Sequence, residues 1–370
     1  MYKNDFALSE GVYLLNHSVG RPLKTAQQSF SKNFFSPWEQ SNKEPWESWL
    51  DVIDQFTGGL AKLFNAKQSE FCPQVNLSSG LTKIIMSLDQ LQTQNCVVLL
   101  SENDFPSIGF ALQYALPKSC ELRFIPKYLD MSCANVWDEH LTNDVDMVLI
   151  SHAYSNNGQL APLNDIIPMA KSKGILTLID IAQSGGVVPL DLNNLKPDFM
   201  IGSSVKWLCG GPGAAYLWVN EDHIQACQPK DVGWFSHDNP FEFDIHDFRF
   251  NDSALKFWGG TPSIAPFAIA ENSINHFAKI GSQAIREHNQ QLTTLIANAF
   301  PDRTVSPIEH HLRSGTIVLN FGKKQDKVFR TLQESNITVD CRAQGMRISP
   351  HIYNDASDIN QLLSAIKASI

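Results

Sequence analysis

The sequence is poor in charged residues, which make up 18% of its 370 positions, and it has no apolar run long enough to cross a membrane. A membrane-spanning helix needs about 20 consecutive apolar residues. The opening MYKNDFALSEGVYLL lacks the basic-then-apolar order of a secretory signal. The net charge is −9, and no run of Lys and Arg would attract a polyanion. We therefore expect an unexported, cytoplasmic protein that binds neither nucleic acid nor a membrane, but a small molecule.

Cysteine motifs are also missing. The seven cysteines are scattered from Cys72 to Cys341 without a CxxC pair. Such scatter is typical of a reducing compartment and argues against a disulfide framework or a zinc site. We expect neither, and no other metal. Cys341 is the one cysteine with a candidate chemical role, because the neighbouring cation of Arg342 would favour its thiolate form.

Hydrophobic residues make up 43% of the chain, which is enough for a large core, and its length favours two domains. In the middle of the chain, short β-branched runs alternate with helical stretches such as 163–174, which ends at a glycine. This alternation predicts an α/β fold with a mostly parallel sheet covered by helices. The predicted strands are 95–101, 146–151, 175–182, 199–204 and 214–219.

The texture of the sequence changes after Trp258, where the segment GGTPSIAPFAIAENSINHF becomes helical. The last hundred or so residues resemble a smaller α+β domain with a closing helix over 357–370. The strands predicted in this domain are 316–321, 336–340 and 346–349.

Two polar residues follow predicted strands, at the edge where open α/β sheets bind ligands. Asp180 lies at the end of an apolar strand, where a carboxylate is costly unless paired, although it would also serve as a simple cap. Lys206 follows the next strand, 26 residues later. A lysine there is usually solvated, but in a cleft it can attack a carbonyl as a Schiff-base nucleophile. Together the two residues suggest pyridoxal 5′-phosphate, with Lys206 on the aldehyde and Asp180 keeping the pyridine nitrogen protonated.

A phosphate site should accompany this cofactor. The segment NLSSGLTKIIMSLDQL leads from polar residues into a predicted helix, whose free N–H groups and positive dipole end attract an anion. The same residues would also make a plain helix cap. The candidate phosphate contacts are Ser79, Gly80, Leu81 and Thr82.

Residues 150–219, from ISHAYSNNG to AAYLWV, resemble the core of the class V aminotransferase family of fold-type I pyridoxal-phosphate enzymes. The likeness extends from YLLNHSVGRP near the start to MRISPHIYN near the end, and the joint spacing of Asp180, Gln183 and Lys206 is its most specific part. The resemblance adds Gln183, Ser203 and His152 to the cofactor contacts, although His152 would equally suit a hydrogen-bonded core position.

The resemblance also implies three parts of the chain. Residues 1–40 would form an N-terminal segment that contributes to the substrate site and the small domain. Residues 41–258 would form the large cofactor-binding domain, and residues 259–370 the small C-terminal domain. In the N-terminal segment, Asn16 and His17 resemble the stretch that contacts substrate.

Several stretches are most similar to the kynureninase branch. By this resemblance Phe105 stacks on the cofactor ring, and Trp234 and Thr261 reach the phosphate from a partner subunit. Arg347 then binds the substrate carboxylate, which suits a planar guanidinium. Shared sites of this kind imply a homodimer. The simpler alternatives are that the aromatic residues are core residues and that Arg347 forms a surface ion pair.

Three positions depart from the kynureninase pattern. Ile108 stands where that branch has an aspartate, Val205 where it has a tyrosine, and Gln183 where it has a histidine, as in the desulfurase branch. The leading hypothesis is an enzyme that binds an amino acid through an external aldimine and resembles kynureninase, which cleaves a C–C bond by hydrolysis, or another class V enzyme. Freed Lys206 would then be the general base.

Two alternatives remain. The first is a cysteine desulfurase or other C–S lyase, although Cys341 lies only six residues before Arg347, in a predicted strand and turn rather than on a long mobile loop. The second is a non-catalytic homologue that binds the cofactor.

Overall fold

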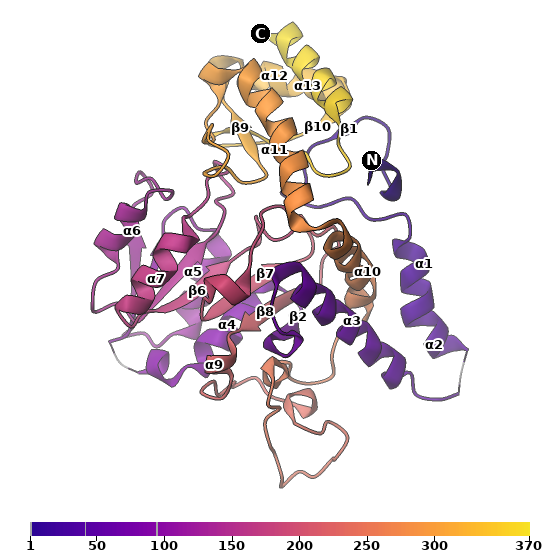
Figure 1. The fold of residues 1–370 in the computed structure, drawn as a ribbon, viewed down its shortest axis with the longest axis vertical. Helices are drawn as coiled ribbons and strands as arrows, with labels where there is room; N and C mark the ends of the chain where they lie inside the picture. Colours follow the sequence, from indigo (N-terminus) through magenta and orange to yellow (C-terminus); the bar gives the residue numbers. More distant parts are fainter. Residues whose placement is uncertain (1, 41, 94) are drawn as a thin grey trace.

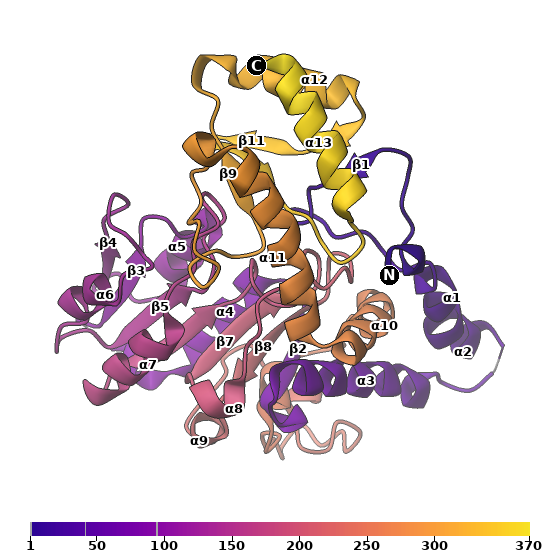
Figure 2. The same cartoon turned by 45° about the horizontal axis from the view of Figure 1, so that its top comes forward.

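The computed structural model of the chain describes residues 2–40, 42–93 and 95–370. The chain forms a large part built on a central sheet and a smaller part that lies above it in Figure 1. The long helix α11 runs from the smaller part down to the larger one in both Figures 1 and 2.

The central sheet has seven strands in the order β2-β8-β7-β6-β5-β3-β4. The five strands β4, β3, β5, β6 and β7 are parallel, whereas β8 is antiparallel to β7 and β2 is antiparallel to β8. Their bounds are β2 (Phe71–Gln74), β3 (Val97–Ser101), β4 (Glu121–Ile125), β5 (Met147–Ser151), β6 (Leu176–Asp180), β7 (Phe199–Ser203) and β8 (Ala215–Val219). The predicted α/β class with a mostly parallel sheet is confirmed.

The five strands predicted in the middle of the chain all form, because they are apolar runs buried on both faces. The sequence did not predict β2 and β4. β4 is an edge strand that exposes Glu121 and Phe124, so it lacks a continuous buried run. β2 is interrupted by Pro73, which is typical of an edge position.

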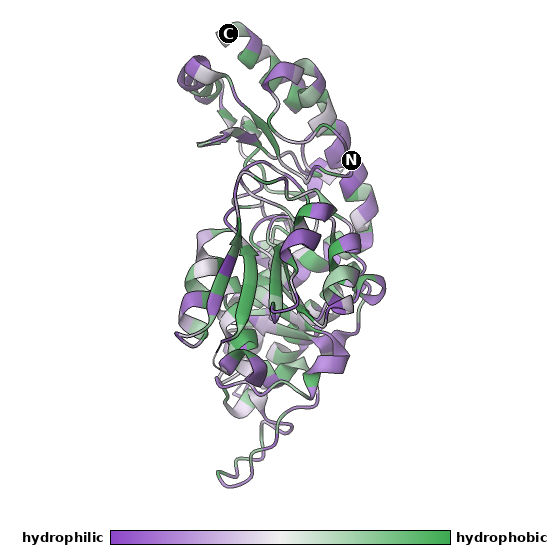
Figure 3. Ribbon diagram, turned by 90° about the vertical axis from the view of Figure 1, so that its left-hand side faces the viewer, coloured by the Kyte–Doolittle hydropathy of each residue, from purple (hydrophilic) through white to green (hydrophobic). Residues whose placement is uncertain are grey.

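Helices cover both faces of this sheet. On one face α4 (Leu77–Ser87) and α5 (Pro106–Ala115) pack against Leu100, Leu149 and Ile201. On the other face lie α3 (Trp46–Phe64), α6 (Ala134–His140), α7 (Leu163–Ser172) and α10 (Ala265–Ile280). Figure 3 shows the strands between them as mostly hydrophobic. α10 therefore belongs to the core of the large part, although it lies after Trp258, where the pattern of the sequence changes.

The smaller part has its own core. A three-stranded antiparallel sheet has the order β11-β12-β9, and the N-terminal strand β1 pairs in parallel with β10. The apolar residues Val12 and Leu14 join this core, so the N-terminal segment is built into the smaller part. Its elements are β1 (Val12–Tyr13), β9 (Ile317–Leu319), β10 (Ile337–Thr338), β11 (Asp340–Arg342), β12 (Gly345–Ile348), α11 (Ser282–Ala299), α12 (Gln325–Glu334) and α13 (Ala356–Ser369).

Short elements complete the described chain. The short α-helices are α1 (Ala26–Phe30), α2 (Ser36–Glu39), α8 (Leu192–Leu195) and α9 (Glu221–Ile224), and η2 (Ser31–Phe35) is a π-helix. The 3₁₀ turns are η1 (Tyr2–Asp5), η3 (Gln68–Glu70), η4 (Asp89–Gln92), η5 (Trp234–Ser236), η6 (Ala254–Phe257), η7 (Pro301–Arg303) and η8 (Gly322–Lys324). Among the described residues, we find no helix with the length and apolar character that a membrane span requires.

A disulfide joins Cys96 to Cys120, whose Cα atoms lie 4.7 Å apart. The expectation that the cysteines form no disulfide is wrong for this pair. The two residues precede β3 and β4, which are neighbouring parallel strands, and the N–H of Glu121 donates to the carbonyl of Cys96. Strand pairing thus brings together two cysteines whose separation of 24 residues carries no motif.

Candidate active site

A cavity of about 240 Å³ opens at the carboxyl ends of the parallel strands. Ser151, Asp180 and Ser203 are the last residues of β5, β6 and β7, and all three line it together with Lys206. We call it the cofactor cavity. Its other lining residues are Asn76, Leu77, Ser78, Asn103, Phe105, Ser107, Ile108, Ala153, Tyr154, Ser155, Ala182, Gln183 and Val205.

Lys206 lines the cavity and is half-buried. Burial lowers the pKa of its amine; the carboxylate of Asp180 opposes this shift, and Arg347 adds to it. Its Nζ lies 5.9 Å from the ring centroid of Phe105. A lowered pKa increases the fraction of neutral amine, which is the form that attacks a carbonyl.

Asp180 faces the cavity without a cationic side chain in ion-pair contact among the described residues. It is 7% exposed, and one carboxylate oxygen, Oδ1, accepts a hydrogen bond of 2.8 Å from the N–H of Ala182. Burial raises its pKa, although that hydrogen bond and Lys206 oppose the shift. A buried carboxylate in this state is stabilised by a cationic partner such as a protonated ring nitrogen.

The N-terminus of α4 forms one wall of the cavity. Asn76 caps the helix by accepting a hydrogen bond of 2.8 Å from the N–H of Ser79. Ser78 lies between the cofactor cavity and an adjoining cavity of about 470 Å³, which Ser79 and Thr82 line. This arrangement suits an anion at a helix N-terminus. The predicted contacts Gly80 and Leu81 line neither cavity.

Other predicted cofactor contacts lie in different places. Phe105 lines the cavity and is 58% exposed, so it is not a core residue. Gln183 lines it too, and its side chain bridges the carbonyl of His17 and the indole of Trp207. His152 is buried and does not line the cofactor cavity. It lines a second cavity on the opposite side of the chain, whereas its neighbour Ala153 lines the cofactor cavity.

Arg347 lies beyond the cavity wall, held in place by Asp340. Its Nε and Nη2 donate to the two carboxylate oxygens of Asp340 at 2.8 and 2.5 Å, and Nη1 donates to the carbonyl of Ser155 at 3.1 Å. Burial alone would raise the pKa of Asp340, but the hydrogen bonds from Arg347 and His17 hold it well below its usual range. Ser155 lines the cofactor cavity, so Arg347 borders it from the smaller part.

The N-terminal segment connects the two parts around this site. Asn16 donates to the carbonyl of Lys206 at 3.4 Å and accepts from Tyr353 at 2.5 Å. His17 contacts Asp340 and Ser349. Both predicted residues are buried and act here as structural bridges, and neither lines the cofactor cavity.

The same segment crosses very close to the lysine loop at Gly20. Its N–H donates to the carbonyl of Val205 at 2.9 Å, and a Cβ at this position would lie 2.2 Å from the carbonyl oxygen of Lys206. Only glycine fits such a close approach of two backbones.

Trp234 and Thr261 lie together, away from the cofactor cavity of their own chain. The indole N–H of Trp234 donates to the hydroxyl of Thr261 at 3.2 Å, and neither residue lines the cavity. Trp234 begins the short turn η5, and the long segment 237–253 that follows this turn extends from the lower end of the molecule in Figures 1 and 3.

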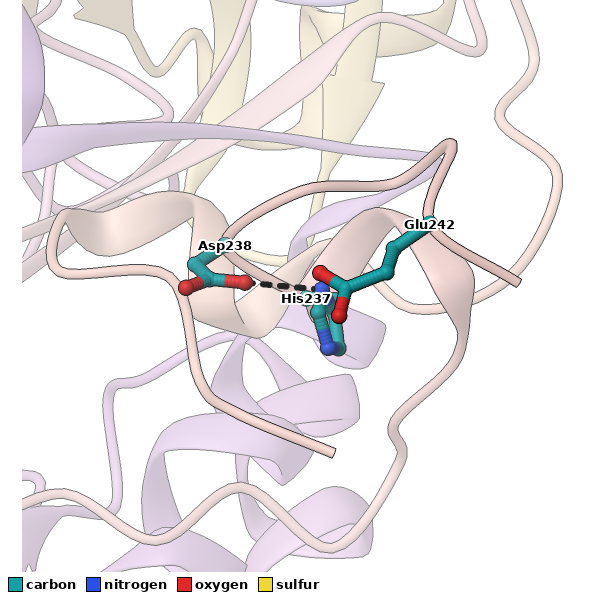
Figure 4. A group of neighbouring side chains, drawn as sticks. All are labelled: His237, Asp238 and Glu242. Carbon is teal, nitrogen blue, oxygen red and sulfur yellow. Dashed lines mark ion pairs between the residues drawn. The ribbon is translucent and has the colours of Figure 1, made fainter. Parts of the chain in front are cut away.

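A group with metal-binding residue types lies within that extended segment. Ligand atoms of His237, Asp238 and Glu242 lie within 4.8 Å of one another (Figure 4). Arg249 forms ion pairs with Asp238 at 3.1 Å, with Glu242 at 2.5 Å, and with Asp247. The guanidinium of Arg249 therefore already neutralises these carboxylates. The cluster is explained as a set of ion pairs that stabilises the extended segment.

Sequence reasoning missed several cavity residues. Tyr154 and Ser155 come three and four residues after the end of β5, so the rule that ligands bind beyond strand ends would have found them. Asn76 could have been found as the capping residue before the α4 helix. Asn103 and Ser107 carry no signal of their own, because the turn into α5 brings them to the cavity.

The fold and this cavity define the class of protein. The family model described as "Aminotransferase class-V" matches residues 25–362 of the chain. The chain therefore belongs to this family. The predicted class, an enzyme that uses pyridoxal phosphate, is thereby confirmed. The lowered pKa of Lys206, the buried carboxylate of Asp180 and the start of α4 fit the aldehyde, ring nitrogen and phosphate of that cofactor.

Among curated proteins, kynureninases are similar to the chain over most of its length. The kynureninase of Deinococcus radiodurans is 26% identical over 378 residues, which covers 96% of this chain and 89% of that protein. The kynureninase of Burkholderia mallei is 26% identical over 329 residues, covering 84% of this chain and 77% of that protein.

Solved structures of a different activity share the fold. The cysteine desulfurase of Thermococcus onnurineus NA1 has a TM-score of 0.85 at 17% identity, covering 97% of this chain and 94% of that one. A cystine C–S lyase in complex with its product cysteine persulfide has a TM-score of 0.87 at 19% identity, covering 97% of this chain and 98% of that one. At these identities the likeness concerns the fold.

Proposed function

We propose that the protein is a kynureninase-like enzyme that binds an α-amino acid and cleaves a bond in its side chain by hydrolysis. The observation that carries this proposal is the meeting of Lys206, Asp180 and Phe105 in one cavity bordered by Arg347. The full-length similarity to kynureninases supports it.

Pyridoxal phosphate, when bound, supplies an aldehyde that takes an amine and a ring that withdraws electrons from the attached carbon. The amine of Lys206 would hold the aldehyde and, when free, would act as a base on the proton of the substrate Cα. Asp180 would keep a proton on the ring nitrogen. Phe105 would cover the ring, and the start of α4 would hold the phosphate.

Arg347 has donors left for a substrate carboxylate. A guanidinium has five N–H donors; two are used by Asp340 and one by the carbonyl of Ser155. One N–H on each Nη nitrogen remains, which is the number that a bidentate carboxylate needs. The ion pair with Asp340 fixes the plane of the guanidinium and so prepares it for that contact.

A C–S lyase is the second candidate, because Gln183 occupies the desulfurase position and solved desulfurases share the fold. Against a desulfurase, Cys341 lies within β11, paired with Met346 of β12, and not on a mobile loop. Burial raises the pKa of its thiol, whereas the sequence led us to expect that Arg342 would favour the thiolate. Arg342 instead pairs with Asp340 at 3.6 Å.

Product analysis separates these candidates. The holoenzyme is incubated with kynurenine and, separately, with cysteine, and anthranilate and sulfide are measured. The Lys206→Ala variant gives the background, and the variant of the exposed Lys171, Lys171→Ala, is the matched control. Anthranilate that depends on Lys206 supports the proposal, whereas sulfide without anthranilate would favour the lyase.

We also propose that the protein works as a homodimer with shared sites. Trp234 and Thr261 contact each other and do not line the cavity of their own chain, as expected if they complete the cavity of a second chain. Mixing Lys206→Ala with Trp234→Ala subunits tests this, because a mixed dimer would hold one intact site. Activity that appears only on mixing supports the shared site, and two variants that stay inactive together contradict it.

The cytoplasmic location remains a prediction. The disulfide between Cys96 and Cys120 is more typical of oxidising compartments. Fractionation of cells, with thiol labelling of the protein in each fraction, tests the prediction; recovery outside the cytoplasm would contradict it.

A further inference from the structure

A second cavity, of about 770 Å³, lies between the large and the small part of the molecule. We call it the hinge crevice. Its walls are the end of α3, the segments 160–165 and 188–195, the first turns of α11, and His311 with Leu312. α11 joins the two parts in Figure 2, so the crevice lies where they meet.

Arg286, on α11, brings an uncompensated positive charge to this crevice. Its Nη2 donates to the carbonyls of His310 and Arg313 at 2.6 Å each, while Nη1 is buried without a hydrogen-bond partner. Within the part of the chain that the structure describes, no carboxylate forms an ion pair with it. Burial and the neighbouring Arg313 lower its pKa to about 10. A half-buried guanidinium whose Nη1 is withdrawn from water without a counter-charge is costly to hold.

His152 faces the same crevice. It is 6% exposed, and its Nδ1 is buried without a partner in the described residues. Burial lowers the pKa of its ring to about 4, and Arg286 contributes to the shift. The ring is therefore neutral near pH 7 and adds a polar group without adding charge. Arg286 thus remains the source of positive charge at this wall.

Two carboxylates also line the hinge crevice, and neither neutralises Arg286. Asp191 caps α8, where it accepts hydrogen bonds from the N–H of Asn194 and the side chain of Asn65. Asp165 lies exposed in the first turn of α7, where the helix dipole favours it. Each carboxylate is thus stabilised at the N-terminus of its own helix. Neither one pairs with Arg286, so its guanidinium can bind an external anion.

We propose that the hinge crevice is a second ligand site, which binds a small anion through Arg286, the anion carrying a carboxylate or a phosphate group. This charge would complete the ion pair that the chain leaves open. The site is separate from the cofactor cavity, because the chain between them presents His152 to the crevice and Ala153, Tyr154 and Ser155 to the cavity. The proposal does not depend on the reaction that the enzyme performs.

Calorimetric titration of the holoenzyme with inorganic phosphate tests this site, since the bound cofactor already fills its own phosphate position. We expect saturable binding that weakens about tenfold or more in Arg286→Gln, the effect of losing a charge-assisted hydrogen bond. The exposed Arg330 lies on α12, away from the crevice, so Arg330→Gln should bind like the wild type. A parallel titration with malonate shows whether carboxylate or phosphate is preferred.

A second variant guards against misfolding of Arg286→Gln. Ser282 lines the crevice one helical turn before Arg286, so Ser282→Glu supplies an internal carboxylate at the i,i+4 position. We expect a higher Tm and loss of phosphate binding. In the double variant that also carries Arg286→Gln, the new ion pair cannot form, so only the part of the Tm increase that comes from the helix dipole should persist. Absence of saturable binding to the wild type, or unchanged phosphate affinity in Arg286→Gln or Ser282→Glu, would overturn the proposal.

Discussion

The cofactor cavity and the hinge crevice differ in whether their cationic side chains have a carboxylate nearby. In the cavity, Lys206 and Asp180 influence each other, and Arg347 at its border is paired with Asp340. In the crevice, Arg286 has no carboxylate partner among the described residues. The cavity is built from strand ends that follow one another in a parallel sheet, whereas the crevice joins segments from both parts of the molecule. A motif search therefore finds the first site, while only the packing of the two parts reveals the second.

Removing Lys206 should produce the largest difference between the two sites. In Lys206→Ala we expect kcat to fall by roughly 10²- to 10⁴-fold or more, because a nucleophile and base are lost together. Phosphate binding at the hinge crevice should stay unchanged. Steady-state kinetics and calorimetry on one preparation measure both effects, and equal losses at the two sites would show that the variant had unfolded.

Changing the guanidinium of Arg347 should have a smaller effect that is specific to substrate binding. Arg347→Lys keeps the charge but loses the planar fork, so we expect KM to rise by about 10- to 100-fold with little change in kcat. Kinetics with the preferred amino acid measure this. Asp340→Asn, which keeps Arg347 but removes its positioning partner, should raise KM less. A fall confined to kcat in Arg347→Lys would contradict the role in carboxylate binding.

A methyl group at Gly20 should disturb the cofactor cavity through the backbone. Gly20→Ala places a Cβ against the carbonyl of Lys206, and overpacking of this kind costs about 1–3 kcal/mol of unfolding free energy. Gly109 is the matched control, because a Cβ there meets no atom within 4 Å. Thermal or urea unfolding should show a loss for Gly20→Ala and none for Gly109→Ala; equal stability of the two variants would refute the close approach.

The smallest expected effect is a change of stability with pH on the side of the cofactor cavity. Burial raises the pKa of Asp104 to about 7, although a hydrogen bond from the N–H of Ser101 opposes the shift. The folded state thus holds this proton more tightly than the unfolded state does. The stabilising contribution is complete below the unfolded value near 3.8 and is lost as the pH rises through about 7.

Asp104→Asn removes this titration because the amide stays neutral. Relative to the wild type, the variant should gain unfolding free energy between acidic and mildly alkaline pH, because only the wild type loses the stabilising proton. Urea unfolding at several pH values measures the gain. His152 and Arg286 in the hinge crevice, with pKa values of about 4 and about 10, should titrate outside the neutral range. If the difference in unfolding free energy between the variant and the wild type did not change with pH, the raised pKa of Asp104 would be contradicted.

The sequence predicted the parts of the molecule that rest on local patterns. Buried parallel strands are continuous apolar runs, so β3 and β5–β8 were found, and with them Asp180 and Lys206 at their ends. The exposed edge strand β4 and the proline-containing β2 lack that pattern and were missed.

Contacts that depend on tertiary packing could not be predicted in the same way. The bridges made by Asn16 and His17, and the disulfide of Cys96 with Cys120, arise where segments distant in sequence meet. His152 shows the limit most clearly, because its position after β5 places it near the site, while the alternation of side chains along the chain turns it to the other cavity.

The central claim is that Lys206 carries the cofactor, and one measurement tests it most directly. The holoenzyme is reduced with borohydride, which makes the bond between the lysine and the aldehyde permanent, and the modified peptide is identified by mass spectrometry. The account predicts a single modified peptide that contains Lys206. Label on another lysine, such as Lys83 beside the adjoining cavity, or no label in a protein that binds the cofactor, would contradict it.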